Sequence, residues 1–438
     1  MTADVTIAGD TRLEAHPLRA AILGEVHARP FTPIETPRRV LHFAFETTGE
    51  RGEADRAALV DFCVKRAIPA PLPTAKQHRV ALGATVLRWE QHSEFTTYTW
   101  ELPSETPGEA APFHPAATAL AVPMSLVPQP GPVLVAIDLH LIADLAAKIA
   151  PERLFDRASL AAADNSDGTA LYATDFQSDP AGFVRILIVD RGLGPERAGA
   201  LTQRVLELET YRTLALLGLP EAQRLAPSVR RIETRLAEVT AATRGAQGLE
   251  ANQRLLEQLT ALAAELEAGA AASQFRFGAS RAYDEIVQLR LQTIGERKCG
   301  GLPTWTSFLA RRMAPALRTC AALEERQANL AEKLARAANL LRTRVDVELE
   351  QQNRDVLRAM NERTRLQLML QATVEGLSVA AISYYVVGLF GYLVKGLHDA
   401  HLLRIDPALA TGASVPVAVL LVWWIGRRVR SKHIKGVK

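Results

Sequence analysis

Two long runs without a charged residue lie close to the C-terminus, at 376–394 and 408–425, and they limit how the whole chain can fold. A helix of the first run rises about 1.5 Å per residue and therefore spans roughly the 30 Å hydrocarbon core of a bilayer. The second run contains Pro416 and ends on Trp423 and Trp424, where an interfacial aromatic belt is expected. The sequence predicts two transmembrane helices, the alternative being two buried core helices.

The residues that flank the two runs predict the orientation of this hairpin. Both outer flanks are basic, whereas the connecting stretch 395–407 is short and of mixed charge. The basic residues of the outer flanks are Arg354, Arg358, Arg363, Arg365, Arg427, Arg428, Arg430, Lys432, Lys435 and Lys438. Because positive flanks stay inside, we expect an inner-membrane protein with two spans, an outer loop at 395–407, a basic tail at 426–438 and both termini in the cytoplasm.

Composition narrows the classes to which the rest of the chain can belong. A chain of 438 residues normally forms at least two units. Without its basic tail the chain is slightly acidic, so we expect no nucleic-acid partner. The cysteines Cys63, Cys299 and Cys320 form no Cys-x-x-Cys pair, which argues against a disulfide framework or a thiolate zinc site. The N-terminus lacks the apolar core of a secretory signal, and the first domain is therefore expected in the cytoplasm.

Residues 1–193 show the pattern of strands with a few helices. The predicted strands, rich in β-branched and aromatic residues, are 38–47, 78–90, 94–102, 132–142, 170–176 and 182–190. A helix is predicted at 53–67, and the proline-rich connection 105–132 has room for a short helix at 116–121. This is an α+β or α/β domain.

From residue 194 onward the sequence is helical. Breaks are predicted at 218–220, Gly245 with Gly248, Gly269 and 300–303, so that 194–303 forms successive antiparallel helices. Between Pro315 and Gly376 there is neither glycine nor proline, and a stalk helix within 304–375 can therefore continue directly into the first span. The predicted fold is thus an N-terminal α/β domain, antiparallel helices, a stalk helix and a transmembrane hairpin.

The stalk carries an apolar stripe that needs a cover. Its members recur at three- and four-residue steps and are Leu330, Leu334, Leu341, Val345, Leu349, Val356 and Met360. Either the preceding helices of the same chain or copies of the same helix can cover such a stripe. We expect both, and hence a homo-oligomer; the alternative is a helical bundle within a monomer.

Several blocks of the chain resemble a family of uncharacterised, membrane-anchored bacterial proteins that is defined only as a domain of unknown function. The blocks are HPLRAAILGEVHARPF (16–31), RWEQHSEFTTY (88–98), LELETYRTLALLGLP (206–220), LLRTRVDVELEQQNRDVL (340–357) and TVEGLSVAAISYYVVGLFGYL (373–393). The resemblance covers nearly the whole chain. It implies membership and a membrane location, but no activity and no catalytic residue.

The order of the predicted parts is similar to that of CorA-type divalent-cation transporters. That resemblance implies a homopentamer around the stalk and first span, with divalent cations as possible partners. CorA-type chains carry Gly-Met-Asn or a related Gly-x-Asn at the outer end of the first span, whereas the corresponding place here reads GYLVKGLHDAH and has no asparagine. Shared architecture is only an associational argument for transport.

Two sets of alternating polar residues form the first candidate site. Glu25, His27 and Arg29 would share one face of a strand, and the second set repeats this period of two. The second set is Arg88, Glu90, His92 and Glu94. If the sets converge, the imidazoles and carboxylates of His27, His92, Glu90 and Glu94 suit a metal ion, and the arginines suit an anionic ligand. The alternative is a solvated strand face or a network of ion pairs between subunits.

Further candidate residues lie on the predicted hairpin. The first span presents one face of possible pore-lining residues, namely Ala381, Tyr385, Gly388 and Tyr392, and Glu375 stands at its inner end. Helix packing explains the same spacing, and a carboxylate at the interface can simply be solvated. In the outer loop, His398, Asp399 and His401 either attract a cation or form a hydrated turn.

The function expected from the sequence is that of an oligomeric membrane protein that conducts or senses an ion, with the cytoplasmic domain as a ligand-responsive gate. The competing hypothesis is a membrane-anchored scaffold or binding module without transport, and a membrane-tethered enzyme that uses the region of His27 and His92 comes third. The common nucleotide-binding, metalloprotease and serine-hydrolase signatures are absent, so no enzymatic activity and no particular cofactor is predicted.

Overall fold

A computed structural model describes residues 5–7, 11–13, 16–19, 22–23, 31–104, 112–113, 123–144, 150–400 and 405–434. The chain divides into two compact units, 1–241 with 258–336, and 242–257 with 337–438. The first unit contains a large sheet and the second contains the two apolar helices. The fold is therefore α+β, as the sequence predicts.

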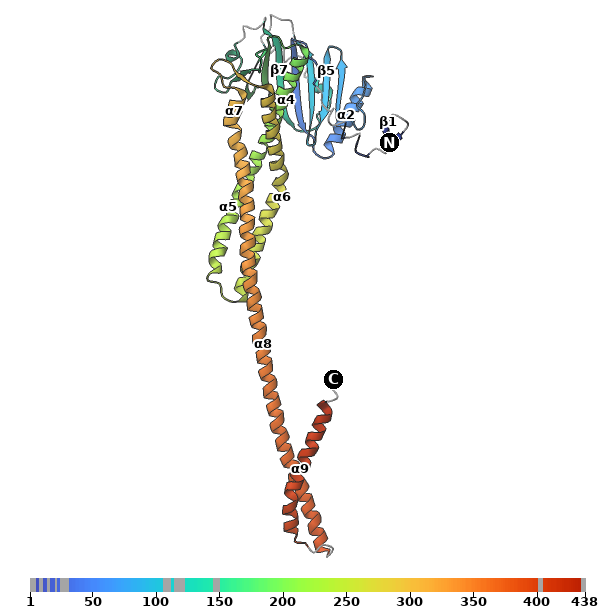
Figure 1. Ribbon diagram of the computed structural model, residues 1–438, viewed down its shortest axis with the longest axis vertical. Coiled ribbons are helices and arrows are strands. Elements are labelled where there is room, and N and C mark those ends of the chain that lie inside the picture. Colours follow the sequence, from blue (N-terminus) through green and yellow to red (C-terminus); the bar gives the residue numbers. More distant parts are fainter. Residues whose placement is uncertain are drawn as a thin grey trace. The chain divides into compact units, whose positions relative to one another are not determined.

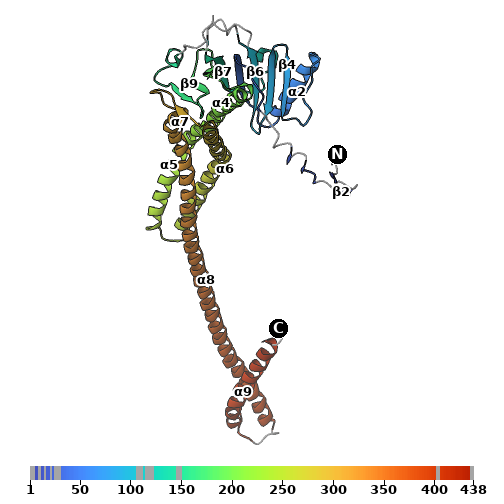
Figure 2. The ribbon, with the colours of Figure 1, turned by 45° about the horizontal axis from the view of Figure 1, so that its top comes forward.

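Within the described residues, nine strands form one mixed sheet in the order β11-β8-β9-β10-β7-β3-β6-β5-β4 (Figure 2). All neighbours are antiparallel except β10 and β7, which are parallel. The strands are β3 (Arg38–Glu46), β4 (Gln77–Leu82), β5 (Thr85–Gln91), β6 (Phe95–Pro103), β7 (Val133–Ala143), β8 (Ala161–Asp164), β9 (Ala170–Ser178), β10 (Val184–Asp190) and β11 (Arg297–Lys298). A separate pair, β1 (Val5–Ile7) and β2 (Thr11–Leu13), is antiparallel.

Helices cover both faces of the sheet, which explains why its central strand β3 is apolar on both sides. On one face, α2 (Arg51–Lys65) packs Leu59 and Phe62 against Trp89 and Trp100. On the other face, α4 (Pro195–Leu216), the end of α6 (Leu249–Ile294) and α7 (Trp305–Arg312) form a second core with β3, β7 and β10. Two short 3-10 turns, at Pro123–Leu126 and Pro151–Arg153, lie in the connections.

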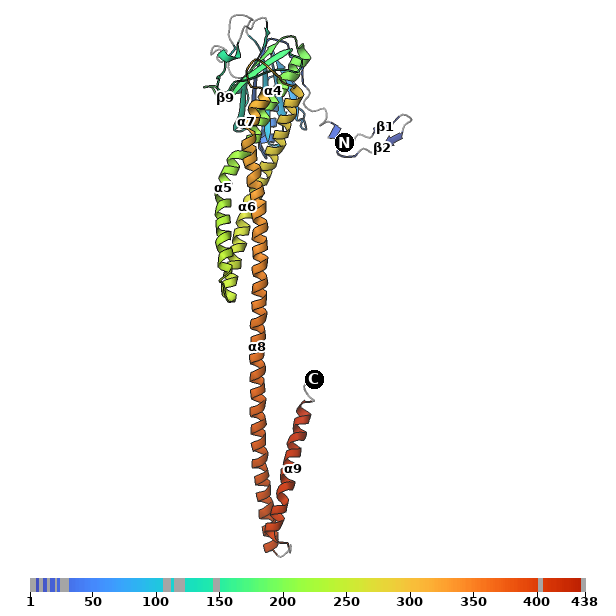
Figure 3. The ribbon, with the colours of Figure 1, turned by 60° about the vertical axis from the view of Figure 1, so that its left-hand side comes forward.

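Three long helices run side by side in the first unit: α5 (Gly218–Thr243), the body of α6 and the first part of α8 (Ala314–Asp399) (Figure 3). One ion pair connects each two of these helices: Arg231 with Glu265 connects α5 and α6, Arg326 with Glu233 connects α8 and α5, and Arg281 with Glu324 connects α6 and α8. Helices α5 and α6 lie in the region 194–303 that the sequence predicts to be helical. The break predicted at Gly269 is wrong, because α6 continues through it. A Cβ at Gly269 would lie 3.7 Å from Leu225 of α5, so the glycine permits close helix packing instead.

Two other predicted boundaries differ from the structure. The stretch 78–90 is a hairpin of two strands rather than one strand, since Gly83 turns the chain with a φ of +65°. The predicted outer loop 395–407 is shorter, because α8 continues to Asp399 and α9 (Pro407–Ile434) starts at Pro407. The short helix predicted at 116–121 lies outside the described residues.

The apolar stripe of α8 is covered only in part. Leu330, Leu334, Leu341 and Val345 are buried, as a cover by helices of the same chain predicts. The following members are exposed, with relative exposures of 38% for Leu349, 53% for Val356 and 60% for Met360.

The second unit contains two helices that are long and apolar enough to cross a membrane. The second half of α8 and α9 run antiparallel and cross (Figure 1). Only 11% of each apolar segment is buried, whereas a core helix of a soluble protein is mostly buried. Small residues form the contact: a Cβ on Gly391 would lie 3.2 Å from the Thr411 side chain, and Ala418 is buried.

The three cysteines are free. Cys63 and Cys320 are buried and Cys299 is partly buried, and burial raises the pKa of all three thiols.

Candidate functional site

The predicted polar set at 88–94 lies at the β5–β6 hairpin, next to α4. Arg88 and Glu90 do share one face, as their spacing predicts, and both are buried. Arg88 donates a hydrogen bond to Gln203 of α4 at 3.1 Å, and its Nε lies 3.9 Å from a carboxylate oxygen of Glu90. Thr97 also contacts Glu90, at 3.4 Å. The pair is thus held between sheet and helix.

His42 of β3 belongs to the same buried cluster. Its Nδ1 lies 2.8 Å from the hydroxyl of Thr99 and its Nε2 lies 3.1 Å from that of Thr210. The Thr210 hydroxyl already donates to the carbonyl of Leu206, so it accepts from Nε2–H, and Thr99 donates to Nδ1. Burial, together with the charge of Arg88, lowers the pKa of His42 from 6.5 to about 3. His42 is therefore a neutral structural group at physiological pH.

No sequence signal connects His42 with Thr210 or Arg88 with Gln203. These partners lie on α4, more than a hundred residues along the chain, and only the packing of α4 on the sheet joins them.

Glu94 and His92, which are neighbours in the hairpin turn, face different partners. Glu94 is buried and accepts hydrogen bonds from Arg276 and from the Tyr283 hydroxyl of α6, each at 2.5 Å. Burial and the contact with Glu94 raise the pKa of Tyr283. The ring of His92 stacks on Phe95, with the ring centres 4.0 Å apart. Glu94 thus fastens α6 to the sheet, while His92 lies at a groove.

The predicted metal site has no support in the described part of the chain. Glu25, His27 and Arg29 lie outside the described residues, so their convergence with Glu90 and His92 stays a prediction. Among the described residues, no group of three or more histidine, cysteine, aspartate or glutamate side chains is placed to hold a metal ion.

A groove of about 440 Å³ opens between the hairpin turn, α2, α4 and α6. Its volume falls in the range of small-molecule sites, roughly 300 to 1,000 Å³. The basic and aromatic side chains that line it are Arg56, Lys76, His92, Phe95, Tyr211 and Tyr283. None of the described side chains that line the groove is a carboxylate. Its chemistry is that of a site for a negatively charged ligand.

A second cavity of about 500 Å³ lies on the other side of Glu94 and has a different character. Three carboxylates and two arginines line it, together with apolar side chains; the charged residues are Glu46, Glu94, Glu221, Arg224 and Arg276. Two ion pairs, Arg224 with Glu221 and Arg276 with Glu94, use these charges. Of these two cavities, only the first has an excess of positive charge.

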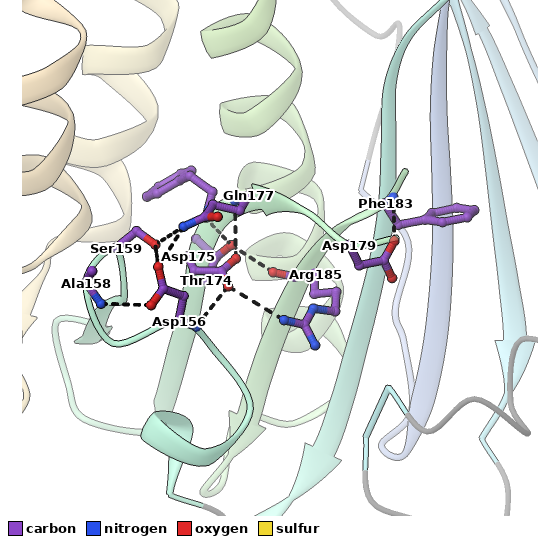
Figure 4. A network of polar contacts seen from close by, with 10 residues as sticks. Asp156, Ala158, Ser159, Thr174, Asp175, Gln177, Asp179, Phe183 and Arg185 are labelled. Atoms are coloured by element: carbon purple, nitrogen blue, oxygen red, sulfur yellow. Dashed lines mark hydrogen bonds and ion pairs between the residues drawn. The ribbon is translucent and has the colours of Figure 1, made fainter. Parts of the chain in front are cut away.

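Another polar network lies on the sheet face that carries Leu187, between β9, β10 and the loop that holds Asp156 (Figure 4). Asp156 accepts hydrogen bonds from Ser159 at 3.1 Å and from Gln177 at 2.9 Å, and its own backbone N–H donates to Asp175. Hydrogen bonds from the Ala158 backbone, Ser159 and Gln177 lower the pKa of Asp156. The groups point at one another, so the network fastens the loop to the sheet.

The possible pore-lining residues of α8 lie on the face that points away from α9. The α9-facing positions include the buried Ser383 and Val394, with Gly391 against Thr411. Tyr385 and Tyr392 are 70% and 80% exposed, Ala381 is exposed, and nothing lies within 4 Å of a Cβ built on Gly388. The predicted common face is present, and α9 does not cover it. Glu375 is partly buried at the α9-facing side.

Of the predicted outer-loop residues, His398 and Asp399 belong to the last turn of α8 rather than to a loop, and both are exposed. His401 lies outside the described residues.

Fold and groove together define a class: an α+β protein with a small-molecule-sized groove beside its sheet and two C-terminal helices that are long and apolar enough to cross a membrane. The chain belongs to the DUF3422 family, described as proteins of unknown function, whose pattern matches residues 14–433. The uncharacterised family expected from the sequence is thus confirmed. No curated protein matches the chain, and no solved structure matches it either.

Proposed function

We propose that this protein is a membrane-anchored binding module whose helices α8 and α9 form a hairpin that crosses the bacterial inner membrane twice. The first compact unit, which contains the nine-stranded sheet and is called the sheet unit below, binds a small ligand in the cytoplasm. The observation that carries the anchor is the pair of apolar segments, of which only 11% is buried. Among the described residues they contact each other through Gly391 and Thr411, and the short link 400–406 joins them. Exposed apolar surface of this extent needs an apolar solvent.

The end of α9 supports the orientation with both termini in the cytoplasm. Arg427 lies over the ring of Trp423 at 5.2 Å, and Arg428 over that of Trp424 at 4.9 Å. Aromatic rings at headgroup level, followed by arginines, are typical of a membrane boundary, and positive residues favour the cytoplasmic side. The basic residues before the first apolar run favour the same side.

Membrane fractionation tests the anchor. The wild-type chain should stay in the membrane pellet after washing with alkaline carbonate and should be released by detergent. The double variant Leu389→Arg with Leu420→Arg places one charge in each apolar run at exposed positions, and each charge costs about 3 kcal/mol at a bilayer centre, so this variant should lose stable insertion.

Leu340→Arg is the matched control, because Leu340 is 71% exposed but lies outside the apolar runs. This variant should fractionate like the wild type. A wild-type chain that carbonate releases would refute the anchor.

The groove of about 440 Å³ supports the binding role of the sheet unit. Its walls come from four separate elements and are joined by hydrogen bonds and ring contacts, so the site is formed before a ligand arrives.

A second candidate function is an ion-conducting homo-oligomer, the CorA-like arrangement. The observation that favours it is the exposed face of Tyr385, Gly388 and Tyr392, which α9 leaves uncovered and which copies of the helix could surround. Liposomes that contain the purified protein would then pass cations, and Tyr385→Lys would abolish the flux. If the purified protein is a monomer and passes no cations, the ion-conducting function is refuted and the membrane-anchored binding module remains.

A further inference from the structure

We propose that the groove beside His92 binds a small organic anion built from a flat ring and a phosphate group. This inference rests on the proposed binding role of the sheet unit and specifies its ligand class. The phosphate would lie between Arg56 and Lys76, and the ring would lie against Tyr211 and Tyr283.

The charge of the groove selects an anion. Arg56 comes from α2, Lys76 directly precedes β4 and His92 lies in the β5–β6 turn, so the basic groups approach the groove from different elements. Glu94 is a carboxylate in the β5–β6 turn, and it already accepts hydrogen bonds from Arg276 and Tyr283. A phosphate ester carries about two negative charges at neutral pH, which match the two permanent cations Arg56 and Lys76.

Arg56 is held in position for such a ligand. Its Nη1 donates to the Pro73 carbonyl at 2.6 Å and to Glu53 at 3.1 Å, and its Nη2 donates to Gln91. A guanidinium has two N–H groups on each Nη, so one N–H of Nη2 is left for a ligand. The pair with Glu53 is a weak competitor, because the Glu53 side chain is 71% exposed to water.

The aromatic wall of the groove selects a ring. Tyr211 of α4 and Tyr283 of α6 stack with ring centres 5.5 Å apart and planes 25° apart, and both rings are partly exposed. The hydroxyl of Tyr283 is bonded to Glu94, which fixes the direction of that ring. Stacking on aromatic side chains is worth about 1–3 kcal/mol for a nucleobase-like ring and depends little on its identity.

The volume of the groove, about 440 Å³, fits a ligand that has both a ring and a phosphate group. Inorganic phosphate alone would leave most of the 440 Å³ unfilled, whereas a ring without a charge would not use the positive charge of Arg56 and Lys76. The cavity beyond Glu94 is larger, but both of its arginines form ion pairs with carboxylates that line it, so it serves as an internal comparison.

Pyridoxal 5′-phosphate is a suitable probe because it combines a flat ring and a phosphate with an aldehyde. The aldehyde condenses with a lysine amine and releases water, and borohydride reduces the resulting imine to a stable amine that mass spectrometry locates. Full-length protein in membranes should be labelled at Lys76 with saturating dependence on probe concentration. The exposed Lys298 of β11 should react about ten-fold more slowly and without saturation, since it lies outside the groove.

Competition with the probe measures how much the ring and the phosphate each contribute to binding. Adenosine monophosphate should protect Lys76 at concentrations about ten-fold lower than adenosine or inorganic phosphate alone. Arg56→Gln should raise the probe concentration at half-saturation about ten-fold, and Lys298→Ala should leave it unchanged.

Equal, unsaturable labelling of Lys76 and Lys298, or protection by adenosine equal to that by the monophosphate, would overturn the proposal. Labelling and membrane fractionation are independent readouts. Saturable labelling of a chain that carbonate releases from the membrane would refute only the anchor, and an unlabelled Lys76 in a carbonate-resistant chain would refute only the ligand.

Discussion

Asp55 connects helix α2 to the sheet through two buried hydrogen bonds. Trp89 Nε1 donates to one of its carboxylate oxygens at 2.8 Å, and the Tyr98 hydroxyl donates to the other at 2.6 Å. We predict that Asp55→Ala lowers the unfolding free energy by about 2–5 kcal/mol, because it leaves two buried donors without an acceptor.

Urea unfolding in detergent, followed through the fluorescence of the buried tryptophans, measures this loss. Asp61→Ala is the matched control on the same helix, since Asp61 pairs with Lys65 on the surface. Its effect should stay within about 0.5 kcal/mol. Equal losses for the two variants would show that the buried pair of bonds contributes no more than a surface ion pair.

His42 makes the stability of the sheet unit depend on pH. Because burial lowers its pKa to about 3, the folded chain binds fewer protons at this ring than the unfolded chain below pH 6.5. The stabilising contribution is therefore present above pH 6.5 and is lost as the pH falls toward 3. The wild type should lose on the order of 3 kcal/mol from this group between pH 6.5 and pH 4.

His42→Gln removes the ionisable ring and tests this effect. The variant is expected to be less stable at pH 7, but its urea midpoint should fall less steeply than that of the wild type between pH 6.5 and pH 4. Parallel pH profiles would assign the acid sensitivity to other groups.

At the scale of single residues, sequence patterns predict which side chains share a strand face but not what they meet. The period-two spacing places Arg88 and Glu90 together, as the structure confirms. His42, Gln203 and Arg276 have no local signal, because their contacts form only when α4 and α6 pack on the sheet. The composition of the groove is therefore a property of tertiary packing.

At the scale of secondary-structure elements, the contact of α8 with α9 depends on Gly391, which has no side chain. We predict that Gly391→Leu destabilises the hairpin by about 1–3 kcal/mol, since the new side chain would overlap Thr411. Loss of helicity on heating in detergent measures this change. Gly376→Leu is the control on the same helix, because nothing lies within 4 Å of a Cβ at that position. A larger loss for Gly376→Leu would mean that the contact face is assigned wrongly.

Most strands and the long helices are predictable because their signals are local. The alternation of β3 and β6 suffices for these strands, and the absence of glycine and proline between Pro315 and Gly376 suffices for most of α8. The sequence does not predict β8, since Ala161–Asp164 has the composition of a helix and becomes a strand only by pairing with β9. The helix break predicted at Gly269 is wrong for a related reason, because this glycine lies at the contact with α5 and does not end α6.

For the whole molecule, the exposed stripe of α8 argues for association of chains. The exposed stripe includes Leu349 and Val356, and exposed apolar residues follow further along the helix at Leu370, Val374, Leu377 and Tyr385. It thus extends from a charged stretch, which we expect in water, into the apolar segment. Lipid covers only the apolar part and a soluble partner only the charged part, whereas a second copy of α8 covers both.

We predict that the particle mass in detergent is a multiple of the monomer mass, measured by light scattering. Val356→Glu with Met360→Glu should reduce it, because charges on the stripe oppose the contact. Arg354→Glu with Arg358→Glu introduces the same residues on the charged face and should not change it. A monomeric wild type would refute association.

The raised pKa values of the three native thiols make the proposed membrane topology accessible to cysteine labelling. The thiolate form of a cysteine adds to the double bond of a maleimide, and burial disfavours that form at Cys63, Cys299 and Cys320. A cysteine introduced at the exposed Ala400 would therefore react against a nearly silent background. A reagent that cannot enter cells then reports on which side of the bilayer the tip of the hairpin lies, with all three native cysteines left in place.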